Sequence, residues 1–167
     1  PGRRIEGAEW VAGDVPGPPQ IVEGGSPACS RPPLDLVQVP AIEDFETPEA
    51  YYATLFHELG HASGHASRLN RPGVTGRIVF GSCDYGREEL VAELASAFLC
   101  AEVGIDNSTL GSSASYIKGW LQALADDPRA VVAASGLAQR AADRILGRDE
   151  AAAWHDAVDP EGGEASP

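Results

Sequence analysis

Two histidines and a glutamate stand together in the pentapeptide HELGH, which contains His57, Glu58 and His61. On a helix, residues four apart lie on one face about one turn apart, so both imidazoles can reach a single cation. Glu58 is rotated by about 100° from His57, beside such a cation rather than on it. The pattern predicts a zinc site with Glu58 as general base, although HExxH also arises by chance in ordinary helices.

A tetrahedral zinc site of this kind needs a third protein ligand besides its water. The segment REELVAEL offers Glu89 and Glu93, which are four apart and share a helix face. We expect Glu89 to be the ligand and Glu93 to accept a hydrogen bond that orients a histidine, and the reverse assignment stays open. Glu88 points off this face and is interpreted as a solvated acid near the helix N-terminus.

Further residues are weaker candidates for the site. His65 follows Gly64, where the helix is expected to stop, so we expect local hydrogen bonding or cleft lining rather than metal ligation. Tyr116 could stabilise an oxyanion, or it could be a partly buried aromatic on an amphipathic helix. His155 lies in the acidic tail and is not expected to contribute. Two imidazoles and a carboxylate favour Zn²⁺, but cobalt, nickel or manganese suit the same ligands.

The motifs are expected on helices. Thr47 as N-cap and Pro48 at the first helical position predict a helix over 48–63. Apolar periodicity predicts a second helix over 85–104, a third starting near Ser113 and a fourth over 128–146. LDLVQV alternates like a strand, and we expect it to be the edge strand beside the cleft. Residues 1–33 are expected to be irregular with short edge strands, and 71–82 to form a hairpin or loop.

The bulk composition limits the function classes. A chain of 167 residues predicts one domain, over 1–147, followed by an acidic, disordered tail over 148–167. The net charge of −13 makes this segment a poor candidate for nucleic-acid binding, although a DNA mimic remains conceivable. No signal peptide or membrane span is visible, so a cytoplasmic protein is expected. Cys29, Cys83 and Cys100 are interpreted as buried thiols, and the absence of Met indicates a segment of a longer polypeptide.

A family resemblance rests on three blocks that follow one another in the chain: YYATLFHELGHASGHASRLNR, YGREELVAELASAFLCAEVGI and SASYIKGWLQALADDPRAVVAASGLAQRAADRIL. Together they resemble the zincin-like metallopeptidase domain at the C-terminal end of ArdC-type antirestriction proteins of plasmids and phages. The resemblance implies His57 and His61 as ligands, Glu58 as catalytic acid and base, and an acid within 89–93 as third ligand. It also implies an N-terminal single-stranded-DNA-binding domain, which this chain is expected to lack. Ala62-Ser63 stands where relatives often carry Trp-Thr, so the cleft wall is expected to differ.

The fold class expected is therefore α+β, with a helical core of about four helices and a small N-terminal β-sheet. The expected function is zinc-dependent hydrolysis of peptide bonds in a peptide or protein substrate. The alternative is a non-catalytic, zinc-stabilised binding module that protects plasmid or phage DNA from restriction. Contact with DNA by this domain alone and contact with a membrane are not expected.

Overall fold

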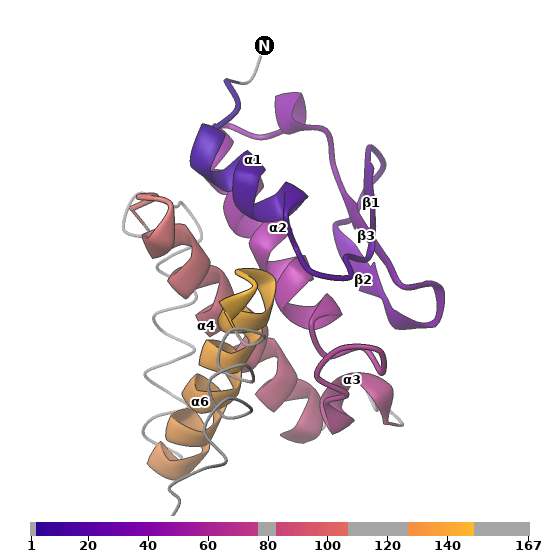
Figure 1. The fold of residues 1–167 in the computed structure, drawn as a ribbon, viewed down its shortest axis with the longest axis vertical. Coiled ribbons are helices and arrows are strands. Elements are labelled where there is room, and N and C mark those ends of the chain that lie inside the picture. Colours follow the sequence, from indigo (N-terminus) through magenta and orange to yellow (C-terminus); the bar gives the residue numbers. More distant parts are fainter. Residues whose placement is uncertain (1–2, 77–82, 107–126, 149–167) are drawn as a thin grey trace, which may run out of the picture.

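The computed structural model describes residues 3–76, 83–106 and 127–148 of the chain. Helix α2 lies between a small sheet with α1 on one side and helices α4 and α6 on the other (Figure 1). The α+β fold class is confirmed. In chain order the elements are α1 (Glu6–Gly13), β1 (Gln20–Glu23), β2 (Cys29–Arg31), β3 (Leu36–Val39), α2 (Pro48–Ala62), α3 (Pro72–Thr75), α4 (Cys83–Glu102) and α6 (Pro128–Ile145), with short 3-10 helices at Pro32–Leu34 and Ile42–Asp44.

Helix α2 begins as the sequence predicts. The Thr47 hydroxyl accepts a hydrogen bond from the Ala50 N–H at 3.2 Å, and Pro48 occupies the first turn. A capped N–H and a preset φ both favour helix initiation at this point. Tyr52 and Phe56 are fully buried on α2, in a core that also includes residues of α1, the sheet and α4. This packing fixes the orientation of the helix that carries HELGH.

Helices α4 and α6 pack together through small side chains. Their shared cluster is built from Val91 and Ala95 on α4 and three alanines on α6: Ala134, Ala138 and Ala141. Small residues let two helix backbones approach closely, so α6 packs against α4, and it also contacts α2 near its C-terminal end through Ala142 and Ile145. The predicted bounds 85–104 and 128–146 agree with α4 and α6 to within about two residues, the usual uncertainty at helix ends.

The strand predicted from LDLVQV lies in the middle of the sheet, so its assignment as the edge beside the cleft is wrong. The strand order is β1-β3-β2, with β1 parallel and β2 antiparallel to β3. Val37 and Val39 of β3 are fully buried, as expected for the inner face of a central strand. Prolines in the preceding 3-10 helix and a left-handed Asp35 delay the strand start to Leu36. The edge near α2 is β2 instead.

Two helices were not predicted. Helix α1 occupies a segment expected to be irregular, because Ala8 and Val11 are buried in the main core even though glycines weaken its propensity. Helix α3 is a single turn inside the expected hairpin or loop, with Val74 buried. The third predicted helix, from Ser113, and the acidic tail beyond Arg148 lie outside the described residues. In the described parts of the chain, no helix is long and apolar enough to span a membrane.

Candidate functional site

The two histidines of HELGH converge near the C-terminal end of α2. Nε2 of His57 and Nε2 of His61 are 3.1 Å apart, and the rings meet at 82°. Two nitrogens held about 2.0–2.1 Å from one tetrahedral ion lie about 3.3 Å from each other. The observed separation therefore fits a cation shared by both imidazoles.

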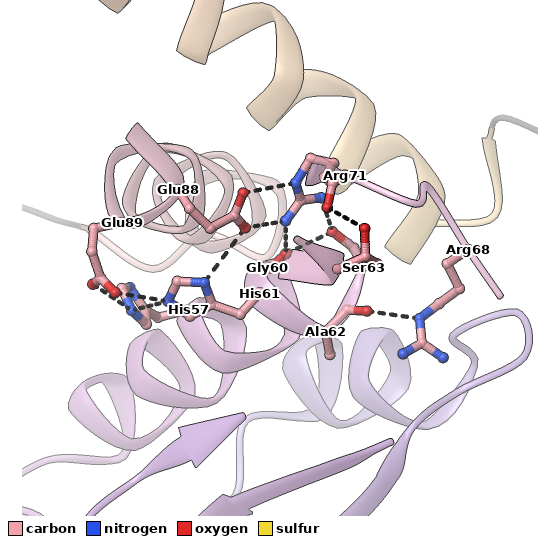
Figure 2. Close-up of polar contacts among 10 residues, drawn as sticks. His57, Gly60, His61, Ala62, Ser63, Arg68, Arg71, Glu88 and Glu89 are labelled. Carbon is pink, nitrogen blue, oxygen red and sulfur yellow. Dashed lines mark hydrogen bonds and ion pairs between the residues drawn. The ribbon is translucent and has the colours of Figure 1, made fainter. Parts of the chain in front are cut away.

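Glu89 brings its carboxylate from α4 to the same point, as Figure 2 shows. Oε2 of Glu89 is 3.7 Å from Nε2 of His57, and Oε1 is 3.5 Å from Nε2 of His61. One ligand atom from each of the three residues lies within 4.8 Å of the others. Two imidazoles and one carboxylate form a donor set that suits zinc, with a coordination position left for water or substrate.

The Nδ1 atom of each imidazole lies near a carboxylate other than that of Glu89. Oε1 of Glu93 is 3.2 Å from Nδ1 of His57, and Oε1 of Glu88 is 3.5 Å from Nδ1 of His61. A carboxylate at Nδ1 favours the tautomer with the proton on that nitrogen, which leaves the Nε2 lone pair free. Both lone pairs then point toward the place where Glu89 lies. Metal ligation by Glu89, and the supporting role of Glu93, stay predictions.

The surrounding acids favour positive charge at this place. Burial alone would lower the pKa of His57, but the hydrogen bond to Glu93 and the charge of that carboxylate outweigh it. The charges of Glu58 and Glu89 act in the same direction, so the pKa lies above its ordinary value. The same negative potential that holds a proton on an imidazole attracts a metal cation.

Glu58 lies beside the three converging residues and is only 8% exposed. Burial raises the pKa of Glu58 above its ordinary value. The charges of His57 and His61 and a hydrogen bond from the backbone of Ser30 offset only part of this rise. A carboxylate with a raised pKa, next to a cleft, is chemically suited to accept and release a proton near neutral pH.

The two histidines of HELGH, Glu58 and Glu89 line an open cleft of about 380 Å³. One wall comes from the segment that contains β2, and the other comes from α3 and the start of α4. The lining residues are Ala28, Cys29, Ser30, Pro32, His57, Glu58, His61, Gly73, Val74, Glu88 and Glu89. The cleft therefore runs between the outer strand of the sheet and the helices that present the histidines and acids.

The interpretation of Glu88 as a solvated acid is wrong. Glu88 is only 7% exposed, and Arg71 donates to its two oxygens at 2.5 and 3.1 Å. Burial would raise the pKa of Glu88, but hydrogen bonds from His61 and Arg71 and the charge of Arg71 hold it below its ordinary value. The helix turns this side chain inward because the segment after α2 folds back and supplies a buried guanidinium.

The remaining candidate site residues either lie apart from the two histidines and Glu89 or lie outside the described residues. His65 makes local contacts, with Nδ1 2.8 Å from the Ser67 hydroxyl and 3.2 Å from the Ser67 backbone nitrogen, so local hydrogen bonding is confirmed. It is not among the residues that line the cleft. Tyr116 and His155 lie outside the described residues.

The cysteines differ from one another. Cys100 is a buried thiol, as predicted, and burial raises its pKa to about 11. Cys29 is only partly buried and lines the cleft, so its interpretation as a buried thiol is wrong. The side chain of Cys83 lies outside the described residues.

Sequence reasoning missed Arg71 and the wall that contains Ser30. No local pattern marks Arg71, because its partner Glu88 lies 17 positions away. Two adjacent acids at the start of a helix that faces two histidines are the signal that could have indicated a role for Glu88. Ala62 and Ser63 were expected to alter the cleft wall, but both are buried and neither lines the cleft.

Residues 18–137, well over half of the chain, match the zincin-like metallopeptidase family. An uncharacterised protein, y4eC, of Sinorhizobium fredii is 46% identical over 123 residues, which are 74% of this chain and 39% of that protein. The DNA primase TraC of Escherichia coli is 41% identical over 122 residues, which are 73% of this chain and 8% of TraC.

Solved structures of the antirestriction protein ArdC from plasmid R388 have a similar fold. Its Mn(II)-bound form is 33% identical with a TM-score of 0.64, covering 94% of this chain and 53% of ArdC. Its metal-free form is 32% identical with a TM-score of 0.63, covering 90% and 54%. The chain thus spans less than two thirds of the length of each of these proteins. Sequence match and fold agree that this chain belongs to the zincin-like metallopeptidase family.

Proposed function

We propose that this chain is a zinc-dependent peptidase domain in which His57, His61 and Glu89 hold the metal and Glu58 moves the proton. The observation that carries the proposal is the convergence of the two Nε2 atoms, 3.1 Å apart, with both oxygens of Glu89. Membership of the zincin-like metallopeptidase family supports the same reaction class. We further propose that the domain serves an antirestriction protein, by similarity to ArdC.

The proposed roles of the metal ligands and of Glu58 in catalysis follow from the positions of their side chains. A bound zinc ion supplies Lewis acidity that lowers the pKa of water to about 7 and polarises a carbonyl. Glu58 takes the proton from the attacking water and then passes it to the leaving amine nitrogen. Burial raises the pKa of Glu58, which favours both the acceptance and the release of that proton near neutral pH.

The peptide is proposed to lie along β2. Among the described strands, β2 pairs only with β3, so its other edge can offer backbone N–H and C=O groups to an extended chain. Cys29 and Ser30 of this strand line the cleft above the histidines. A peptide paired with β2 would therefore bring a scissile carbonyl near Glu58 and the metal ligands.

Two variants test the proposal on the 167-residue chain. Glu58→Gln keeps the metal but lowers cleavage of a fluorescently labelled casein by about 10²–10⁴-fold, because the proton acceptor is lost. His57→Ala loses both the metal and cleavage. Metal content is measured by elemental analysis after loading with zinc and, separately, with manganese. Cleavage by the Glu58 variant at the wild-type rate would exclude the proton-transfer role.

A second candidate is a metal-stabilised binding module that cuts nothing. The names of the relatives favour it, since one is an antirestriction protein and another a DNA primase. Under this alternative, Glu58→Gln and wild type bind a partner protein equally well and neither cleaves it. Zinc-dependent cleavage that disappears in the Glu58 variant would rule this alternative out.

A further inference from the structure

Arg71 makes a buried set of contacts directly behind His61 (Figure 2). Its guanidinium donates to both oxygens of Glu88, to the Ser63 hydroxyl at 2.7 Å and to the Gly60 carbonyl at 2.7 Å. The side chains of Arg71 and Glu88 are 5% and 9% exposed. The Arg71 contacts therefore join the C-terminal turn of α2, through Gly60 and Ser63, to the first turns of α4, through Glu88.

Two glycines leave the space that the Arg71–Glu88 pair occupies. A Cβ at Gly64 would lie 2.9 Å from Cζ of Arg71 and 2.5 Å from Cγ2 of Val74. A Cβ at Gly73 would lie 3.0 Å from Oε2 of Glu88. The two distances from Gly64 are shorter than a real Cβ tolerates, and the distance from Gly73 is tight enough that Glu88 would have to shift.

The pair has a polar neighbour on the cleft side. Oε1 of Glu88, the oxygen that accepts from Arg71 at 2.5 Å, also lies 3.5 Å from Nδ1 of His61. A buried charged pair is costly unless its remaining hydrogen-bonding capacity is used, and His61 is the group that uses it. A carboxylate held in this place keeps the proton on Nδ1 and limits rotation of the ring.

We propose that Arg71 and Glu88 are positioning residues of the metal centre: Arg71 fixes the Glu88 carboxylate, which in turn directs Nε2 of His61 at the metal. The inference rests on the proposed metal site. It gives His61 the support that Glu93 gives His57, so each histidine has a separate carboxylate on α4. Arg71 does not line the cleft, and Glu88 lines it beside His61.

The chain contains a matched control for the ion pair. The Arg68 side chain is 2% exposed, pairs with Asp35, which is 36% exposed, and donates to the Ala62 carbonyl at 2.8 Å. It makes no contact with either histidine in the described structure. Arg68→Lys and Arg71→Lys therefore remove the same bidentate geometry, one away from the metal centre and one behind it.

The experiment measures zinc affinity of the 167-residue chain by competition with a chromophoric chelator, and the thermal midpoint without metal. Arg71→Lys and Glu88→Gln are expected to weaken zinc binding by about 10- to 100-fold, because each breaks the two-oxygen contact between Arg71 and Glu88 that fixes the carboxylate. Arg68→Lys is expected to lower the metal-free midpoint but to change zinc affinity by less than about threefold. Glu88→Gln keeps the size of the side chain, so it serves if Arg71→Lys does not fold.

The outcomes separate this inference from the proposed function. The inference alone would be overturned if Glu88→Gln and Arg71→Lys bound zinc as tightly as wild type. In that case wild type would still bind zinc and His57→Ala would not, so the proposed function would stand. Equal weakening of zinc affinity by Arg68→Lys would also overturn it, because a general loss of packing would then explain the effect. Wild type that binds no zinc would overturn both proposals.

Discussion

At the scale of single residues, three acids on α4 differ in how far solvent reaches them. The side chain of Glu89 is 38% exposed, that of Glu93 is 18% exposed and that of Glu88 is 9% exposed. A group that shares a metal with substrate has to face the cleft, whereas groups that hold histidines lie behind them. The depth of each carboxylate thus fits the different task that we propose for it.

Glu89→Ala and Glu93→Ala are expected to differ in zinc content. The first removes a proposed ligand and should weaken zinc binding by more than about 100-fold, since three protein ligands become two. The second should weaken it by about 10- to 100-fold, because His57 keeps its nitrogen but loses the acceptor at Nδ1. Zinc competition with a chelator gives both values.

Glu93→Gln is the matched control, since its amide oxygen can still accept from Nδ1 of His57. Its zinc affinity should therefore lie between those of wild type and Glu93→Ala. If Glu93→Ala empties the site while Glu89→Ala retains zinc, the two roles are reversed, the alternative that helical spacing alone leaves open.

The sequence predicts which side chains share a helix face where the spacing is local. His57 with His61, and Glu89 with Glu93, are pairs four residues apart, and a helix alone brings each pair to one face. Glu88 was misplaced because its environment depends on a guanidinium from another segment. Helical periodicity reports which face a residue occupies but not which distant group covers that face.

At the scale of elements, α2 and α4 approach each other closely at Gly60, the glycine inside HELGH. A Cβ at Gly60 would lie 3.1 Å from Cα and 3.3 Å from the carbonyl oxygen of Ala92. These atoms belong to the backbone of α4, so they cannot move without moving the helix. Ala92 stands directly before Glu93, and the helix spacing therefore sets how far the acids reach toward the histidines.

Gly60→Ala is expected to lower the free energy of unfolding by about 1–3 kcal/mol, through overpacking, and also to weaken zinc binding. Gly136→Ala on α6 is the matched control, because nothing lies within 4 Å of its Cβ position. That change should stabilise the protein by about 0.5–1 kcal/mol through helix propensity. Urea unfolding measures both effects. A Gly60→Ala variant as stable as wild type would show that the helices can separate freely.

Elements with their own start and stop signals were predictable. Thr47 and Pro48 define the start of α2, and Asp127 caps α6 by accepting from two backbone N–H groups. Helix α1 has no side-chain cap, and its formation depends on burial of two residues against the core. The order of the strands depends on pairings between distant segments, which alternation within one strand does not specify.

At the scale of the whole molecule, a polar network ties the N-terminal segment and the sheet to α2. The Arg4 guanidinium binds Glu9 on α1 and Glu23 on β1. The hydroxyl of Tyr51 donates to Glu23 at 2.6 Å, and that of Tyr52 donates to Glu9 at 2.5 Å. The carboxylates of Glu9 and Glu23 therefore hold α1, β1 and α2 together.

Tyr51→Phe is expected to change the pH dependence of stability. The hydrogen bond from Tyr51 lowers the pKa of Glu23, with burial opposing it and Arg4 assisting it. This contribution is present above the ordinary pKa of about 4.3 and is lost as pH falls through the lower folded value. The variant should lose about 1 kcal/mol at pH 7, because Glu23 is partly exposed, and should change less between pH 5 and pH 3.

The control for this prediction is Glu23→Gln, which removes the titrating group altogether. In that background, Tyr51→Phe should leave the acid limb of the stability curve unchanged. The free energy of unfolding is measured by urea denaturation at each pH. An acid limb as steep in Tyr51→Phe as in wild type would show that the depressed pKa has another origin.

The proposed metal ligands and the proton carrier all come from residues 57–89, whereas the facing wall comes from residues 28–32. Two separate stretches of chain therefore hold the reactive groups and the surface that a peptide would meet. Under the proposed function, substitutions along this wall would change which polypeptides bind without changing the residues proposed for the chemistry. A designer could exchange that short strand between homologues to redirect selectivity without rebuilding the reaction centre.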